Sequence, residues 1–433
     1  MKTVQFYRFI KKKYPDKIED MFHPDSQNLQ KFMYPIVKKY NEKREKTSFL
    51  SKSAEIFIEK IIAWMEDAEK SFSKTYIQET GLDILPKGDK YFHIPEKVKS
   101  HIERMRWYGK KLSFSIGIRK FNIFLIHPLS QTESKINEWM DKIKHRIYCW
   151  LYIASMESTK DCSKTLNIYL YFTDLKKEFN EEKILGEINV NTAYTFACSL
   201  KESGENEMYL YRKEEWFKVF IHESFHAFAL DFANMSEDIH SNVDRQILKI
   251  FPLRVDLRLY ETYTEMWAEI INIIYIVCKS KSTKKMAKII EFLKMEQLFS
   301  LFQALKILKH NHISYIELYE MTETAKMKRI HHYKETTPIM AYYILKSICM
   351  MNVGDFIKWT TETNKGTFNF RKTEYNLLSF INFFKERYNK IDYLRAMEFT
   401  EGYYSILKKK NLIGGSIEID IFNNLRMSIF EIL

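Results

Sequence analysis

Hydrophobic positions in the middle of the chain form short runs, and polar and turn-forming residues separate them. Leu112–Gly117, Phe121–His127 and Leu166–Thr173 are apolar runs with β-branched and aromatic residues, a pattern that predicts strands. We expect a fourth, exposed strand at Glu187–Ala197 and a short strand or turn at Glu207–Tyr211. These segments predict one small sheet.

Most of the remaining chain has apolar residues at helical spacing. This pattern predicts helices at Ser51–Phe72 and Pro95–Tyr108, and a long helix to about Met156 that opens with the S-x-x-E sequence Ser130–Glu133. Further helices are expected at Glu214–Met235, Leu253–Cys278, Lys284–Lys309, Pro338–Trp359 and Tyr375–Arg387.

The two patterns together predict an α+β fold that is predominantly helical. The chain has only 11 Gly and 8 Pro, too few for an all-β protein dense in tight turns. We divide its 433 residues into an N-terminal helical region (1–110), a core with the sheet and the motif described below (111–280), and a C-terminal helical region (281–433).

The net charge of +12 arises from short, scattered basic runs and indicates a solvated, lysine-rich surface. It allows contact with nucleic acid or another acidic surface, but no zinc-finger, RRM or KH motif is present to make that contact specific. No clean membrane span and no signal peptide are found. Composition does not determine the oligomeric state.

Five cysteines, an odd number, are widely spaced, and no C-x-x-C pair occurs. This spacing predicts neither a disulfide framework nor a cysteine-rich zinc site. We therefore expect reduced thiols in an intracellular protein.

The sequence His222-Glu223-Ser224-Phe225-His226 is an H-E-x-x-H motif inside a predicted helix. Residues four apart share one helix face, so both imidazoles point the same way. Two neutral imidazoles can hold one Zn²⁺, and the glutamate between them can act as a base on a metal-bound water. His222 and His226 are thus candidate metal ligands and Glu223 the candidate catalytic residue.

A zinc site of this kind needs a third protein ligand, and no third histidine follows His226 at short range. The predicted helix Leu253–Cys278 instead carries a row of carboxylates with a spacing of four residues, which places them on one face. Such a row on an apolar helix is costly to bury unless a cation faces it. The members of the row are Glu261, Glu265 and Glu269.

The order strand, strand, helix, strand, strand, motif helix resembles the upper lobe of the zincin metallopeptidases, with a small twisted mixed sheet and a backing helix. Glu265-Met-Trp-Ala-Glu269 resembles the E-x-x-x-[DE] segment of the gluzincin (thermolysin-like) group. The resemblance implies that Glu265 is the third ligand and that Glu269, where thermolysin has Asp, orients His222. Alternatively, Glu261 is the ligand and Glu265 lies behind it.

The same resemblance implies a downstream His or Tyr that stabilises the oxyanion, for which Tyr342, Tyr343 and His331 are candidates. It also implies that an exposed edge strand binds an extended peptide substrate. Asn189, Asn191 and Thr192 are the candidate residues on that strand.

A second resemblance covers NVNTAYT and, shortly after it, YRKEEWFKVFIHESFHAFALDF. These segments are similar to zinc-metallopeptidase-like proteins of large DNA viruses, which implies a location in the virion or the infected-cell cytoplasm. We expect a zinc metallopeptidase with one Zn²⁺ that acts on a peptide or protein. The alternative is a virion structural or interaction protein that keeps the zinc-bound scaffold with little or no turnover.

Overall fold

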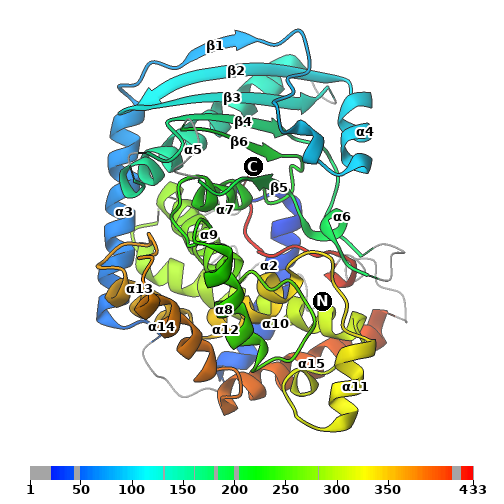
Figure 1. The fold of residues 1–433 in the computed structure, drawn as a ribbon. Helices are drawn as coiled ribbons and strands as arrows, with labels where there is room; N and C mark the ends of the chain where they lie inside the picture. Colours follow the sequence, from blue (N-terminus) through cyan, green and yellow to red (C-terminus); the bar gives the residue numbers. More distant parts are fainter. Residues whose placement is uncertain are drawn as a thin grey trace.

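The computed structural model describes residues 21–42, 49–129, 132–159, 161–179, 184–198, 204–280, 282–411 and 421–432. A mixed six-stranded sheet with the order β1-β2-β3-β4-β6-β5 lies over a helical body (Figure 1). Strands β3, β4 and β6 run parallel, whereas β1, β2 and β5 pair antiparallel with their neighbours. The strands are β1 (Gln78–Gly81), β2 (Trp107–Ile116), β3 (Arg119–Pro128), β4 (Thr165–Tyr171), β5 (Ala193–Thr195) and β6 (Glu205–Leu210).

The two faces of the sheet are covered differently. Alternate residues such as Ile123, Ile168 and Met208 belong to the main core beneath the sheet. The opposite face carries a row of tyrosines that packs under the segment containing the short helix α4 (Glu96–Arg104). Strands β3 and β4 are paired with Ile123 opposite Ile168, so both faces stay in register.

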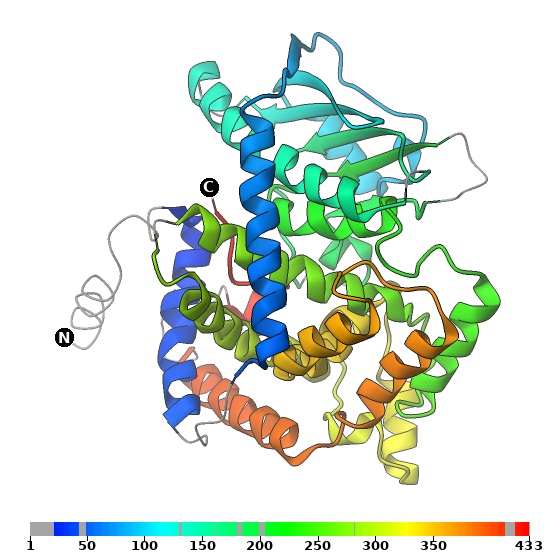
Figure 2. The ribbon, with the colours of Figure 1, turned by 90° about the vertical axis from the view of Figure 1, so that its left-hand side faces the viewer.

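Helix α7 (Trp216–Ala227) lies directly under the sheet, and α9 (Leu259–Lys279) crosses beneath α7 (Figure 1). Figure 2 shows α3 (Lys52–Phe72) running from the sheet down along the helical body. The other long helices are α2 (Pro24–Glu42), α5 (Glu133–Glu157), α8 (Glu237–Leu248), α10 (Lys285–His310), α13 (Val353–Thr363), α14 (Glu374–Lys385) and α15 (Ile391–Asn411). The shorter helical elements are α6 (Glu187–Val190), α11 (Glu323–His331), α12 (Lys346–Met351), the 3-10 helices η2 (Tyr91–His93) and η3 (Ile316–Leu318), and the π-helix η4 (Met340–Leu345).

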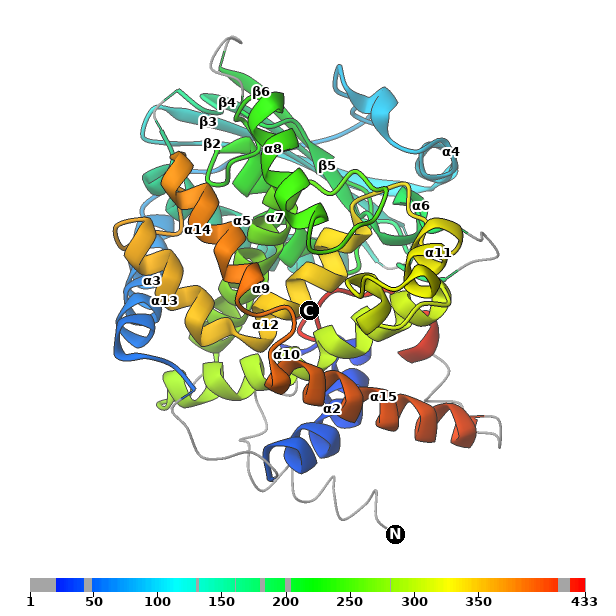
Figure 3. The ribbon, with the colours of Figure 1, turned by 60° about the horizontal axis from the view of Figure 1, so that its bottom comes forward.

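The lower body combines N-terminal and C-terminal helices, with α2 and α15 both packed against α10 (Figure 3). One hydrophobic cluster extends from Phe22 to Ile432 and joins this body to the underside of the sheet. This continuous core marks no boundary at residue 110 or 280, so the division of the chain into three regions stays a prediction. No helix in the described ranges is both long enough and apolar enough to cross a membrane.

The predicted α+β class with predominant helix is confirmed, as are the main strands and helices. Several details differ, among them the motif helix, which was predicted to extend to Met235 but ends at Ala227, and the helix predicted from Leu253, which begins at Leu259. Strand β1 was not predicted because all four of its residues are exposed and only pairing with β2 defines it. Helix α4 ends at Arg104, since Trp107 and Tyr108 already pair in β2. The expected strand Glu187–Ala197 begins as helix α6, and only Ala193–Thr195 pairs with β6. Ser130 lies outside the described residues.

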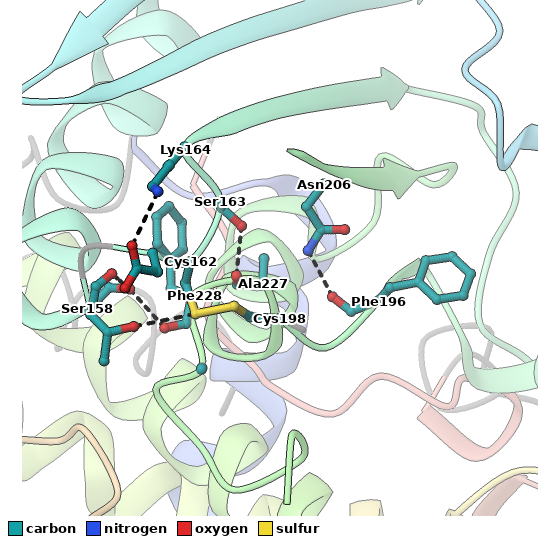
Figure 4. The surroundings of a disulfide bond; sticks show 12 residues. Ser158, Cys162, Ser163, Lys164, Phe196, Cys198, Asn206, Ala227 and Phe228 are labelled. Carbon is teal, nitrogen blue, oxygen red and sulfur yellow. Dashed lines mark hydrogen bonds and ion pairs between the residues drawn. A yellow bond between two sulfur atoms is a disulfide. The ribbon is translucent and has the colours of Figure 1, made fainter. Parts of the chain in front are cut away.

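The prediction that all cysteines are reduced is wrong, because Cys162 and Cys198 form a disulfide (Figure 4). Their sequence separation of 36 residues gave no signal of this pairing, which depends on the sheet bringing the two segments together. Beside the disulfide, the amide of Cys198 donates to the His226 carbonyl at 3.1 Å, and the Ser163 hydroxyl donates to the Ala227 carbonyl at 2.7 Å. These contacts fix the C-terminal end of α7 against the sheet.

Replacing Cys162 and Cys198 together by Ser should lower the free energy of unfolding by roughly 4 kcal/mol, because the 36-residue loop would be free in the unfolded chain. Chemical denaturation followed by circular dichroism measures the change, with Cys278→Ser, which removes a free thiol, as the matched control. Equal stability of both variants would show that the disulfide contributes nothing.

Candidate metal centre

The motif helix α7 is enclosed on all sides, and each of its twelve residues is buried. The sheet covers it from above, α9 crosses it below, and α5 packs alongside. His222, Glu223 and His226 are only 6%, 7% and 7% exposed. Because an ionised group is costly to bury alone, each of them requires a charged or polar partner.

Three donor atoms meet where α7 crosses α9. The Nε2 atoms of His222 and His226 are 3.3 Å apart, and Oε2 of Glu261 lies 3.0 Å from the first and 3.3 Å from the second. Zinc bonds of about 2.0–2.1 Å in tetrahedral geometry put neighbouring ligand atoms about 3.3 Å apart. The two imidazoles and the carboxylate therefore fit three corners of a zinc tetrahedron, and no backbone movement is needed to bring them together.

A second layer of carboxylates contacts the other ring nitrogens. Oε2 of Glu265 lies 3.0 Å from Nδ1 of His222, and Oδ2 of Asp231 contacts Nδ1 of His226. Asp231 is itself fixed, since it accepts hydrogen bonds from the Thr264 hydroxyl and the Ala233 amide, each at 3.0 Å. A carboxylate on Nδ1 holds the proton there and turns the Nε2 lone pair toward the metal position.

Glu265, the expected third ligand, contacts Nδ1 of His222, and the alternative, Glu261, completes the group of three side chains that could hold a metal ion. All three glutamates of the row share one face of α9, so sequence spacing could not distinguish them. The crossing with α7 falls at the first turn of α9, which brings Glu261 beside both Nε2 atoms. Glu261 and Glu265 therefore make the contacts that were expected one turn later, of Glu265 and Glu269.

Glu269 does not orient His222 as expected, because it lies a further turn away and forms an ion pair with Lys346. Two ammonium groups also approach Oε1 of Glu265: Nζ of Lys218 is in direct contact, and Nζ of Lys346 is 3.8 Å away. Although burial opposes ionisation, the cations Lys218 and Lys346 and the hydrogen bond to His222 hold the pKa of Glu265 well below its ordinary value. Glu265 is therefore an ionised acceptor for His222.

Glu223 lines a small cavity together with His222, one of the three donor residues. Burial raises the pKa of Glu223 to about 7, against the opposing effect of His222 and His226. A carboxylate whose pKa lies near neutrality can both accept and return a proton, as a general base must.

The three candidate oxyanion donors have different surroundings. Tyr342 lines the cavity, and its ring centroid is 6.0 Å from that of His222. Tyr343 follows Tyr342 on the same helical turn, but its hydroxyl donates to the Leu425 carbonyl. His331 is exposed at the end of α11. The structure brings only Tyr342 to the site, and Tyr343 and His331 are wrong as candidates.

The candidate substrate strand is also only partly as expected. Asn189 belongs to the helical turn α6, where its buried side chain accepts from the Gly186 amide and donates to the Glu178 carbonyl. It is therefore not an edge-strand residue. Asn191 and Thr192 do line the cavity, just before β5, which is the outermost strand at this end of the sheet.

Three buried residues of the site were missing from the sequence-based set: Asp231, Lys218 and Lys346. Asp231 had a usable signal, since it is an acidic residue in an apolar segment five positions after His226. Lys218 lies four residues before His222 on the same helix and could also have been noticed. Lys346 had no local signal, because only the packing of its segment against α9 brings it to Glu265.

No family model, no curated protein and no solved structure matches this chain. The assignment of a role to the centre therefore depends on its own residues.

Glu261→Gln should weaken zinc binding more strongly than Glu265→Gln, because the first removes a charged ligand and the second only a supporting carboxylate. For Glu265→Gln we expect a loss of roughly 10- to 100-fold in affinity. Zinc content and competition with a chromophoric chelator measure both, and the exposed Glu237→Gln on α8 is the control. The reverse order of the two effects would restore Glu265 as the ligand.

Proposed function

We propose that this protein is a zinc-dependent peptidase of the zincin type, with His222, His226 and Glu261 as ligands of one Zn²⁺. The observation that carries the proposal is the set of three donor atoms 3.0–3.3 Å apart with Glu223 beside them. Carboxylates on both Nδ1 atoms support it, since they orient imidazoles for a metal. A structural zinc site closes its fourth position, whereas here His222 and Glu223 line a cavity.

When bound, the metal would supply a water of lowered pKa and polarise a substrate carbonyl. Glu223 then takes a proton from the water whose oxygen bonds to the scissile carbon. When the C–N bond breaks, Glu223 passes that proton to the leaving amine. Tyr342 lines the same cavity, and its hydroxyl is the candidate donor to the oxygen that becomes negative during attack.

The substrate of this reaction is a peptide or protein in extended form. Strand β5 pairs with β6 on one side only, so its outer edge is the place where a peptide can add as a further strand. Asn191 and Thr192 connect that edge to the cavity beside Glu223. From the resemblance to proteins of large DNA viruses, we propose that the enzyme works in the virion or the infected cell.

Glu223→Gln should abolish peptide hydrolysis while zinc stays bound, because the amide cannot accept the proton but leaves the three ligands unchanged. The expected loss in kcat is at least the roughly 10²- to 10⁴-fold typical of general-base removal. Cleavage of a mixed peptide library, followed by mass spectrometry, and zinc analysis give the two readouts. A zinc-loaded wild-type protein without any turnover would instead support the structural role in the virion.

Tyr342→Phe should reduce kcat by roughly 10²- to 10³-fold with little change in KM, since an oxyanion donor acts in the transition state. Tyr343→Phe is the matched control, because its hydroxyl bonds the Leu425 carbonyl away from the cavity. That variant should lower thermal stability and leave kcat unchanged below the melting transition. Equal kcat losses in both variants would rule out the assigned role of Tyr342.

A further inference from the structure

Two buried lysines line the cavity beside Glu223. Lys177 lies between β4 and α6, and Lys218 lies on α7, one turn before His222. Their side chains are only 1% and 2% exposed, yet both line the cavity. Buried lysines are rare because the ammonium loses its hydration, so two beside one small cavity require an explanation.

Each ammonium has a single carboxylate partner. Nζ of Lys177 lies 2.9 Å from Oε2 of Glu215, and Nζ of Lys218 contacts Oε1 of Glu265, with the sulfur of Met427 at 3.7 Å. An ammonium has three hydrogens to donate, so each lysine keeps donor capacity on the cavity side.

The two partner carboxylates are themselves engaged in other contacts. Glu215 also accepts from the amides of Met427 and Ser428, and Glu265 accepts from His222. Each carboxylate therefore divides its acceptor capacity between its lysine and other donors.

Thr192 supplies an independent observation at the same cavity. It lines the same cavity, it is 2% exposed, and its hydroxyl has no hydrogen-bond partner among the described residues. A buried hydroxyl without a partner is uncommon in a folded protein and indicates a group that binds there. A hydroxyl and two ammonium groups together can donate to an acceptor with two oxygens.

We propose that this cavity binds a substrate carboxylate, so that the enzyme selects peptides with a carboxylate next to the scissile bond. The carboxylate is either the side chain of Asp or Glu or the free C-terminus of the peptide. The proposal rests on the proposed peptidase function, since Glu223 and the cavity share a wall. A carboxylate between Lys177 and Lys218 would accept their remaining hydrogens in charge-assisted hydrogen bonds, which are stronger than the bonds that a neutral amide would accept. The net charge of +12 also favours the approach of acidic peptides.

The test uses the full-length Glu223→Gln protein, which can bind substrate without turnover, and fluorescent peptides measured by anisotropy. Pairs of peptides differ only by Glu or Gln at one position, and each is made with a free and an amidated C-terminus. We expect roughly 10- to 100-fold tighter binding of the peptides that carry the recognised carboxylate. A preference for Glu identifies a side-chain carboxylate, and a preference for the free terminus identifies a terminal one.

In the Glu223→Gln protein, a second change Lys177→Met should remove the preference for the carboxylate peptides. The second change Thr192→Val keeps the side-chain shape and should reduce the preference without loss of folding. Lys176→Met is the matched control, because that neighbouring lysine pairs with Asp25 instead. Equal binding of all peptides, or a preference that survives both Lys177→Met and Thr192→Val, would overturn the proposal.

Cleavage of the same peptides by the wild-type protein distinguishes a failure of the carboxylate site from a failure of the proposed peptidase function. Cleavage without any preference for a carboxylate would reject the carboxylate site and keep the peptidase. Carboxylate-dependent binding that needs Lys177, with no cleavage by the wild-type protein, would keep the binding site and reject the peptidase.

Discussion

Two histidines and three carboxylates meet where α7 crosses α9, and each of these groups is buried with the others as its main partners. The imidazoles of His222 and His226 face Glu261 through their Nε2 atoms and are held from behind by Glu265 and Asp231. In such apolar surroundings an unpaired charge would cost far more than any single contact gains. The position of α7 relative to α9 is therefore constrained by charge as well as by packing.

Lysines continue this arrangement away from the centre. Lys346 connects Glu265 with Glu269 and also donates to the Met427 carbonyl in the C-terminal segment, residues 421–432. The amides of that segment in turn donate to Glu215 and Glu296. Because these contacts join α7, α9, α10 and the C-terminal segment, the candidate site is part of the same interior that holds the lower helical body together.

The sequence was sufficient where a residue's role depends on near neighbours. The i, i+4 spacing predicted that His222 and His226 face the same way, and the strand and helix patterns predicted the α+β class. It was insufficient where the role depends on the crossing of two elements. Three glutamates on one face of α9 are equivalent along the chain, and only the crossing point with α7 distinguishes Glu261 from Glu265. The pairing of Cys162 with Cys198 depends in the same way on how the sheet folds.

The sequence by itself determined the motif helix, the general order of strands and helices, and the set of acidic residues from which a third ligand could come. These follow from periodicity, which local backbone geometry imposes on neighbouring residues. Only the tertiary structure decided which glutamate meets the two histidines, that Asp231 supports His226, and that Lys177, Lys218 and Thr192 share one cavity. Those contacts join residues far apart in the chain or directed by packing, and their distances depend on the whole core.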